Sequence, residues 1–553
     1  MSYLLRGLTA AAVAASVLFA QPALATSASP AAVAAETLLS QGKPATASSV
    51  EGSGFAAGLA VDGNSATRWA SAEAHDPEWI SVDLGATASI TRVKLNWEAA
   101  YGKTYKIQAS ADGSAWTDVF STTTGNGATD DLTVSGSGRY VRVYGTARGT
   151  AYGYSLWDLE VYGTTQAGGS GPAVPFGSHQ FPYAAGMLKP TGSQAMLDQK
   201  VIDYYQSWKS AFVKQNCGNG WYQIISPDAD HPYVAEAQGY GMVITATMAG
   251  ADPAAKTIFD GLVKYMLAHP SVNNADLLAA EQNTSCVSVN GSDSATDGDM
   301  DVAYGLLLAD KQWGSTGTYN YKQLAIKHIN AIKASEINPN TNLLTFGDWS
   351  TSGDETYNMS RTSDWMVDHF RAFKTATGNS VWDTIRTKHQ TVTASLQSGY
   401  APNTGLLPDF VINTNSSPKP ATGEVLEDPN DGSYWWNACR DPWRIGADAV
   451  TSGDSASLAA ARKLNTWIKS KTGGNANNIA TGYKLNGTQI DSGSEASFFA
   501  PFAVVAMTDT SSQAWLDALW NKMLTTPVDT NSYYAASIQL QVMITTSHNH
   551  WVP

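Results

Sequence analysis

The sequence predicts a two-domain protein, in which an all-β sandwich precedes an all-α domain. Short runs of alternating apolar residues at 79–84, 91–97 and 140–144 are separated by Asp, Gly and Ser turns, as in antiparallel sandwiches. Further along the chain, apolar residues recur every three or four positions, which predicts amphipathic helices. Residues 164–177 lie between these two patterns and begin with a Gly- and Ser-rich stretch typical of a flexible linker.

The first 25 residues predict a signal peptide. Arg6 precedes an Ala-rich apolar stretch that runs to Ala20, and Ala23-Leu24-Ala25 supplies a small-x-small cleavage site. No later segment holds 18 uncharged apolar residues, so we expect no membrane span. The mature protein is therefore expected to be secreted and extracellular, with the β-sandwich at 36–163 and the helical domain at 178–553.

The composition limits the kinds of partner. Only 15% of the 553 residues are charged, and there are 18 Trp and 24 Tyr, which argues against disorder and suits both sugar stacking and large cores. The net charge of −14 argues against a nucleic-acid partner. It would attract a cationic polymer, although many acidic proteins carry such charge for solubility alone. We expect a monomer.

Three cysteines indicate one disulfide and one thiol. None of Cys217, Cys286 and Cys439 lies in a CxxC arrangement, so a structural zinc site is not expected. We favour Cys217–Cys286 as the pair, although the spacing does not fix the connectivity.

The helical domain is predicted from apolar stripes at helical spacing. Four of them are Leu197, Val201, Tyr205, Trp208 and Phe212; Ile258, Phe259, Leu262 and Met266; Trp365, Met366, His369, Phe370 and Phe373; and Trp515, Leu516, Leu519, Trp520 and Met523. Long polar loops join these segments, and such loops at one end of a helical domain would form a binding site.

Hydrolysis of a glycosidic bond requires two carboxyl groups, one protonated and one ionised. Glu236 stands between two Ala residues at the expected start of a helix, followed by Gly239, Tyr240 and Gly241. Desolvation there would raise its pKa and keep it protonated. The alternative is a carboxylate that only stabilises the helix dipole.

Two further stretches are rich in acids. Residues 293–301 hold several aspartates before a helix, but Ala295 and Tyr304 at the third and twelfth positions break the EF-hand pattern. Three acids within five residues also exceed what helix capping needs. Residues 422–444 combine acids, aromatics and two arginines, as expected for a wall that grips a sugar chain.

Together the stretches 236–242, 295–313, 346–349 and 437–444 resemble glycoside hydrolase family 8. The resemblance implies an (α/α)6 barrel and an inverting mechanism without a catalytic cofactor. Glu236 would match the general acid, and Asp297 would match the acid that holds the sugar at the cleavage subsite.

The resemblance leaves the general base open. Many cellulases and xylanases of this family have an Asp at the position of Asn437, and an amide cannot take a proton from water. The chitosanase-type branch instead places a Glu in the preceding loop, which makes Glu427 our favoured base and Glu424 the alternative. Residues 360–366 also resemble this branch. We expect substrate contacts from Tyr240, Asp299, Trp349, Asp364, Trp436, Asn437 and Arg440, with Asp299 and Asp364 suited to ammonium groups.

The N-terminal domain resembles the discoidin-like carbohydrate-binding modules of family 32 through 60–69, 79–85 and 156–163. The resemblance implies a structural calcium at Asp62, Thr67 and Glu160, and hard oxygen ligands suit this ion. The alternative is a plain Asp-Gly-Asn turn without metal. Trp97, Glu98 and Tyr101 are expected to form the sugar-stacking edge.

The sequence therefore predicts a secreted endo-β-1,4-glycosidase that hydrolyses chitosan, with β-glucanase side activity. The first alternative is an endo-β-1,4-glucanase or mixed-linkage glucanase. The second is a polysaccharide-binding protein without activity, because substitution of the base position is what an inactive enzyme would show. The position of Glu427 relative to Glu236 distinguishes these hypotheses.

Overall fold

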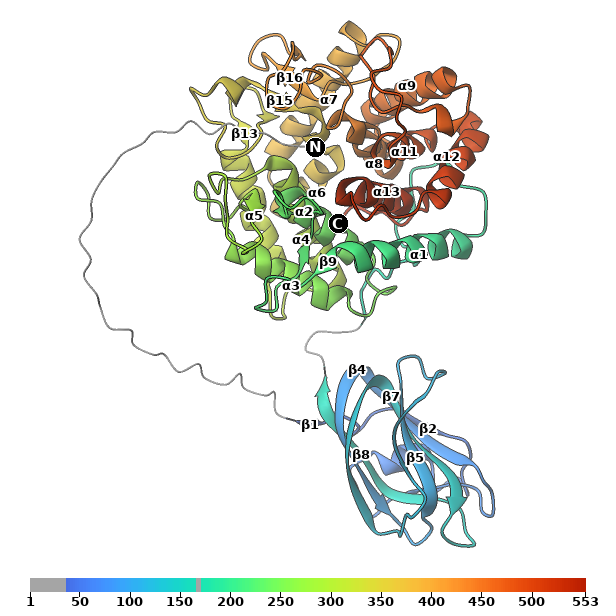
Figure 1. Cartoon of the computed structure of the whole chain (residues 1–553). Coiled ribbons are helices and arrows are strands. Elements are labelled where there is room, and N and C mark those ends of the chain that lie inside the picture. The colour runs from blue at the N-terminus through green and yellow to red at the C-terminus, as the bar shows by residue number, and fades with distance from the viewer. Residues whose placement is uncertain (1–35, 166–170) are drawn as a thin grey trace, which may run out of the picture. The chain divides into compact units, whose positions relative to one another are not determined.

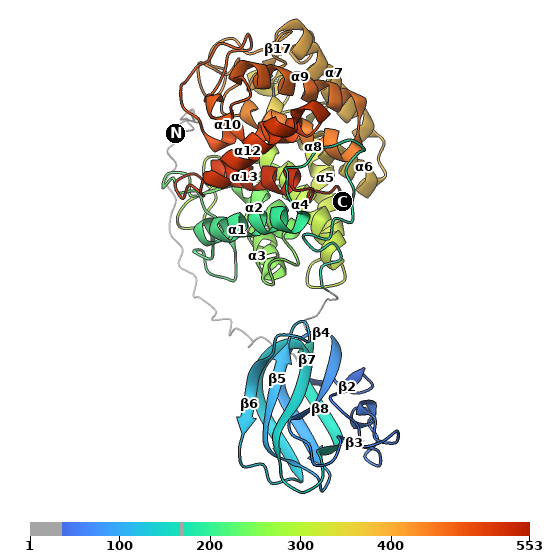
Figure 2. The same cartoon turned by 90° about the vertical axis from the view of Figure 1, so that its right-hand side faces the viewer.

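The computed structural model describes residues 36–165 and 171–553, which pack as two compact units that divide between Gly171 and Pro172. Each unit is seen in two views in Figures 1 and 2. The predicted signal peptide lies outside the described residues. No helix of the described part of the chain is long and apolar enough to cross a membrane.

The first unit is an antiparallel sheet with the strand order β1-β8-β4-β7-β5-β6, and β2 and β3 pair with β4 and β8. The strands are β1 Thr37–Leu38, β2 Ala45–Ala47, β3 Trp69–Ala70, β4 Glu78–Trp97, β5 Gly102–Ser110, β6 Thr117–Thr122, β7 Thr129–Arg148 and β8 Ser155–Thr165. The register of β4 against β7 shifts between Asp83 and Ala88 and again between Ile90 and Arg92. Such irregularities bend long strands, and the sheet encloses one apolar core.

The second unit is helical, as predicted. Its α-helices are α1 Gln194–Phe212, α2 Ala235–Thr247, α3 Ala255–Ala268, α4 Thr296–Trp313, α5 Tyr321–Ser335, α6 Val367–Thr377, α7 Val381–Gly399, α8 Asp441–Ser452, α9 Ser455–Thr472, α10 Ala496–Phe499, α11 Pro501–Ala506, α12 Gln513–Thr525 and α13 Tyr533–Thr546. Short strands lie in the loops: β9 Val213–Lys214, β10 Gln223–Ile224, β11 Tyr233–Val234, β12 Glu281–Gln282, β13 Ile337–Asn338, β14 Leu343–Leu344, β15 Ser360–Arg361, β16 Phe410–Ile412 and β17 Lys419–Pro420.

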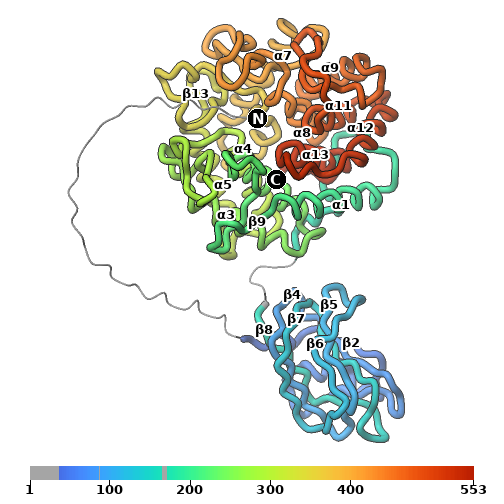
Figure 3. Tube along the Cα trace, in the orientation of Figure 1, coloured from blue at the N-terminus to red at the C-terminus, as the bar shows by residue number. Residues whose placement is uncertain are grey.

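Six helices form a closed inner ring. Helices α2, α4, α6, α8, α11 and α13 each contact the next, and α13 returns to α2. Each inner helix also packs against an outer one, namely α3, α5, α7, α9, α12 and α1 in the same order, and the Cα trace follows the ring in chain order (Figure 3). Helix α4 is buried on almost all sides, whereas α1 buries one stripe that is the predicted set from Leu197 to Phe212. The arrangement is consistent with the predicted (α/α)6 barrel.

Glycines bring α2 and α4 unusually close together. A Cβ atom on Gly239 would lie 2.8 Å from the Cβ of Asp301 and 2.9 Å from the carbonyl oxygen of Gly298. A Cβ atom on Gly298 would lie 2.6 Å from the Cβ of Ala235. Only glycine fits these positions without displacing backbone, so the first turns of the two helices lie side by side.

A buried network of charges joins three inner helices. Arg444 of α8 donates from Nη2 to Oδ2 of Asp301 on α4 at 2.6 Å, and from Nη1 to Oδ1 at 3.1 Å. Oδ1 of Asp301 also lies 2.9 Å from Nε2 of His369 on α6, whose Nδ1 lies 2.8 Å from Asp368. These groups are almost fully buried, and a buried charge depends on its partners to offset lost hydration.

The predicted disulfide and the predicted linker have different outcomes. The Cys217–Cys286 disulfide is confirmed, and Cys439 is a buried thiol. The predicted linker at 164–177 is too long, because β8 runs to Thr165 and residues 173–177 belong to the helical unit. The amide of Ala173 donates to the carbonyl oxygen of Gln312 at 2.9 Å, and that of Phe176 to Ala249 at 2.7 Å.

We expect Arg444→Met to lower the free energy of unfolding of the helical unit by about 3–5 kcal/mol, because it leaves Asp301 as a buried charge without its main partner. Urea denaturation followed by circular dichroism measures the loss. Lys374→Met is the matched control, since its pair with Asp383 is exposed and its loss should lower the free energy of unfolding by about 1 kcal/mol or less. Similar small losses in both variants would contradict a supporting role for the buried network.

Candidate active site

The candidate site lies where the first turns of several inner helices meet. Glu236 is in the first turn of α2 and Asp297 in the first turn of α4, while Tyr533 is the first residue of α13. Arg440 ends the short 3-10 helix Ala438–Arg440 that leads into α8. Partial positive charge at helix N-termini favours carboxylates in such positions.

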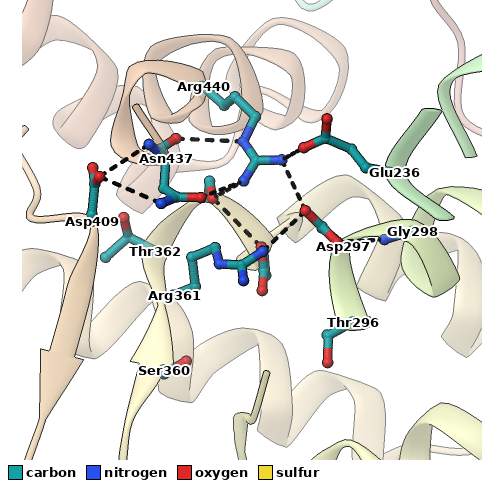
Figure 4. Close-up of polar contacts among 12 residues, drawn as sticks. Glu236, Thr296, Asp297, Gly298, Ser360, Arg361, Thr362, Asp409, Asn437 and Arg440 are labelled. Carbon is teal, nitrogen blue, oxygen red and sulfur yellow. Dashed lines mark hydrogen bonds and ion pairs between the residues drawn. The ribbon is translucent and has the colours of Figure 1, made fainter. Parts of the chain in front are cut away.

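The guanidinium of Arg440 is the centre of this arrangement (Figure 4). Its side chain is 1% exposed. It donates hydrogen bonds to Glu236, to Asp297 at 3.1 Å, to the Ser363 hydroxyl at 2.8 Å, to Oδ1 of Asn437 at 3.1 Å and to the Tyr240 hydroxyl at 3.3 Å. One cation therefore links two carboxyl groups and an amide that come from three separate segments.

Glu236 is placed to hold a proton near neutral pH. Burial raises its pKa to about 7; the charge of Asp297 adds to this rise, and Arg440 opposes it. The Tyr533 hydroxyl donates to Oε1 of Glu236 at 2.9 Å, which also favours the ionised form. The side chain remains 13% exposed, so its carboxyl group is not sealed from a ligand.

Asp297 has the opposite protonation. Burial acts against its ionisation, but the charges of Arg361 and Arg440 outweigh burial and lower its pKa to about 2. Nη1 of Arg361 lies 3.0 Å from Oδ2 of Asp297, and the amide of Gly298 donates to Oδ1 of Asp297 at 2.9 Å. Two neighbouring carboxyl groups with separated pKa values are typical of acid–base catalysis.

Glu427 joins the same network from the loop before α8. Nδ2 of Asn437 donates to its Oε2 at 2.8 Å, and Nη2 of Arg361 lies 3.8 Å from its Oε1. Burial raises the pKa of Glu427, whereas Arg361 and the hydrogen bond from Asn437 lower it. Glu236 and Glu427 are thus connected through Arg440 and Asn437.

The loop that carries Glu427 is held by a buried carboxylate. Asp431 accepts hydrogen bonds from the backbone amides of residues 425–428, at 2.8 to 3.2 Å. Val425 and Leu426 pack against Phe346 and Phe410. Glu424, the alternative base, is exposed at the start of this loop.

Several predicted substrate contacts lie behind the site instead. Tyr240, Asp299 and Asp364 are fully buried, so a direct contact with a sugar does not fit this structure. The hydroxyl of Tyr240 accepts from Arg440, and Oδ1 of Asp299 lies 2.7 Å from Nε2 of His328.

Of the other predicted substrate contacts, two are partly exposed and two belong to the hydrogen-bond network. Trp349 and Trp436 are half-buried, and Trp436 packs edge-on against Phe498. Asn437 and Arg440 are buried within the hydrogen-bond network described above.

Sequence reasoning missed the role of four residues here. Arg361 and Ser363 lie within the stretch 360–366 noted above but were given no role, and Tyr533 was given none either. Asp409 was not noticed at all, although an acid inside the apolar run 406–411 is a signal of a buried and hydrogen-bonded carboxylate. It accepts from the amides of Trp435, Asn437 and Ala438.

In the first unit, the predicted sugar-stacking edge is wrong for Trp97. This ring is buried in the core, donates from Nε1 to Asp130 at 2.9 Å and meets Tyr105 edge-on. Glu98 is half-buried and accepts from the amide of Ala100, and Tyr101 is half-buried as well. Trp97 was misjudged because a tryptophan at a strand end has the same local pattern in a core and at a binding edge.

The predicted calcium ligands are only partly brought together. The Thr67 hydroxyl donates to Oδ2 of Asp62 at 2.8 Å within one turn. Glu160 instead accepts from the Tyr162 hydroxyl at 2.5 Å and lies 3.6 Å from Nζ of Lys94, a cation that would oppose calcium. Within 36–165 and 171–553, no group of three or more His, Cys, Asp or Glu side chains is arranged to hold a metal ion. Calcium at Asp62, Thr67 and Glu160 stays a prediction.

Comparisons with known proteins assign both units. The sequence model "F5/8 type C domain" matches residues 44–159, and "Glycosyl hydrolases family 8" matches residues 185–548. A β-glucanase of Niallia circulans is 47% identical over 69% of this chain and 92% of that protein. The apo structure of a β-1,3-1,4-glucanase from Paenibacillus sp. X4 is 46% identical with a TM-score of 0.67, and covers 69% of this chain and 100% of that one.

The β-unit also has a similar solved structure, chitosan-binding module 1 of a chitosanase/glucanase from Paenibacillus sp. IK-5. It is 57% identical, covers 23% of this chain and 99% of that one, and has a TM-score of 0.23. The predicted resemblances to family 8 and to a discoidin-like domain are confirmed by the two matching sequence models.

Proposed function

Because the chain belongs to glycosyl hydrolase family 8 and is therefore a glycoside hydrolase, we propose that it is a secreted, inverting endo-β-glucanase. Mixed-linkage β-1,3-1,4-glucan is the proposed substrate. The names of the relatives support the glucan alternative of the sequence analysis better than its first choice, chitosan. The family also weighs against the hypothesis of a binding protein without activity.

The observation that carries the mechanism is the buried Glu236 with its pKa near 7 beside an ionised Asp297. Glu236 is the general acid: its protonated carboxyl group donates to the glycosidic oxygen as the bond breaks. Asp297, held ionised by Arg361 and Arg440, binds the sugar at the cleavage subsite. The partial positive charge that develops at the anomeric carbon is stabilised by this nearby carboxylate.

Glu427 is the general base that accepts a proton from the attacking water. Asn437 cannot fill this role because an amide has no basic site at neutral pH. Instead Asn437 donates to Glu427, and Arg361 faces it, so that two groups favour its ionised form. Glu424 is exposed and lies outside the network that joins Glu427 to Arg440.

Three further parts of the proposal have their own support. The closed ring of six inner and six outer helices supports an (α/α)6 barrel. The Cys217–Cys286 disulfide supports secretion, because disulfides persist in oxidising compartments. The β-unit is proposed to bind polysaccharide, since its sequence matches the F5/8 type C domain next to a glycosidase.

Chitosan is a second candidate substrate. The observation that favours it is the pairing of Asn437 with Glu427, which matches the pattern by which the chain resembles the chitosanase-type branch. Barley β-glucan, carboxymethyl cellulose and soluble chitosan, assayed together for reducing-end release, separate the two. We expect the fastest release from barley β-glucan, with the α-anomer as the first product by proton NMR. Faster release from chitosan would overturn the glucan proposal, and a first product with β-configuration would overturn inversion.

We expect Glu236→Gln and Glu427→Gln each to lower kcat by at least about 100-fold, because each removes a proton-transfer group. Binding of β-glucan, measured by isothermal titration calorimetry, should persist in both. Glu424→Gln is the matched control and should retain wild-type kcat because that side chain is exposed. An inactive Glu424→Gln together with an active Glu427→Gln would move the base to Glu424.

Tyr533→Phe should extend activity to higher pH. The lost hydroxyl favours the ionised form of Glu236, so its removal raises the pKa of Glu236. The alkaline limb of the kcat/KM profile should move up by about one pH unit or less, the size expected for one hydrogen bond to a carboxylate. Tyr534→Phe is the control, because that hydroxyl donates to the carbonyl oxygen of Trp436. If the alkaline limb does not move in Tyr533→Phe, the limb does not report the titration of Glu236.

A further inference from the structure

Asp409 lies next to the site and makes an unusual set of contacts. It directly precedes β16 and is 2% exposed. Its Oδ1 accepts from the amides of Trp435 at 2.9 Å and Ala438 at 2.7 Å, and its Oδ2 accepts from the amide of Asn437 at 3.1 Å and from Nδ2 of Asn437 at 3.4 Å. All four partners are N–H donors, so the carboxyl group accepts in every one of these contacts. Figure 4 shows Asp409 beside Asn437.

These contacts determine which way the Asn437 amide points. An amide side chain has one acceptor end and one donor end. In this structure Nδ2 faces Oδ2 of Asp409 and Oε2 of Glu427, both acceptors, whereas Oδ1 faces the guanidinium of Arg440, a donor. A flipped Asn437 would place Nδ2 against Arg440 and Oδ1 against two carboxyl groups.

We propose that Asp409 is a positioning residue that fixes the Asn437 amide in this orientation, so that Asn437 donates to Glu427 and accepts from Arg440. The proposal rests on the proposed function, in which Glu427 is the base. Through Asn437, Asp409 acts on both sides of the reaction, because Arg440 in turn contacts Glu236.

The pKa of Glu427 distinguishes an orienting role of Asp409 from a purely electrostatic one. Arg361, Arg440 and Asp431 face Glu427 besides Asn437, and Asp409 interacts with it through charge. Burial raises the pKa of Asp409 to about 8, although the amides of Ala438 and Asn437 oppose this rise. If Asp409 acted only through its charge, its replacement by a neutral side chain would therefore lower the pKa of Glu427 or leave it unchanged. If it acts by orienting Asn437, its neutralisation removes the donor to Glu427 and raises that pKa. Only the orienting role therefore predicts an upward shift.

Asp409→Asn keeps the shape of the side chain and tests this sign. The new amide has a single acceptor oxygen, which the two shorter bonds from Trp435 and Ala438 should retain. Its NH2 group then faces Nδ2 of Asn437, and the two donors repel each other. We expect the acidic limb of the kcat/KM profile on barley β-glucan to move up by about one pH unit. A downward shift, or an unchanged limb, would overturn the proposal.

Asp252→Asn is the matched control for lost stability. Asp252 is 3% exposed and accepts from Tyr205, from Lys209 and from the amide of Ala254, away from this network. We expect both Asp→Asn variants to lower the thermal unfolding midpoint, but only Asp409→Asn to move the acidic limb. If Asp252→Asn moves the limb equally, the shift reflects stability alone and the proposal fails.

A double-mutant cycle tests whether Asp409 acts through Asn437. Asn437→Ala should by itself move the acidic limb upward, since it removes the donor to Glu427. Adding Asp409→Asn to Asn437→Ala should move the limb no further upward; a full second upward shift would show that Asp409 acts by another route. Glu427→Gln distinguishes failure of the proposed function from failure of the positioning role. If Glu427→Gln stays active, the proposed base is wrong. If it is inactive and Asp409→Asn leaves the acidic limb in place, only the positioning role is refuted.

Discussion

The site depends on one buried cation. The guanidinium of Arg440 has lost nearly all contact with water and contacts Glu236, Asp297, Ser363 and Asn437. A buried charge is tolerated only when its donors are paired, so these partners must stay near Arg440. Arg361 contacts Asp297 directly, whereas its charge acts on Glu236 more weakly. One carboxyl group is therefore held ionised, while burial raises the pKa of the other to about 7. In the proposed mechanism, Glu236 is the acid and Asp297 the electrostatic stabiliser. This difference follows from the number of cations that each carboxyl group contacts: one for Glu236 and two for Asp297.

Helix packing supplies the geometry for this pairing. The inner ring closes from α13 back to α2, which brings Tyr533 to Glu236 although the two are far apart in sequence. Gly239 and Gly298 let α2 and α4 approach so closely that Glu236 and Asp297 share Arg440. A larger residue at either glycine would separate the first turns, and the cation would no longer reach both carboxyl groups. The glycines of the motif therefore serve the chemistry through packing.

Sequence reasoning succeeded where information is local. The apolar stripe of α1, the start of α2 at Glu236 and the acidic first turn of α4 all follow from spacing within a few residues. It failed where the deciding partner lies elsewhere in the chain. Trp97 can lie in the core because its Nε1 donates to Asp130 and its ring packs against Tyr105. Asp299 can be buried because His328 lies beside it. Asp409 acts on amides of residues 435–438, and no pattern near position 409 specifies those partners.

In the proposed mechanism Asn437 cannot act as the base, so a loop must hold the proposed base, Glu427, as firmly as a helix would. The structure does this with two buried carboxylates. Asp431 accepts hydrogen bonds from the backbone amides before and after Glu427, and Asp409 accepts them from the amides around Asn437. Each accepts four N–H groups, which replaces the regular backbone hydrogen bonding that an irregular loop lacks. Asn437 connects the loop that carries Glu427 to the cation that holds Glu236.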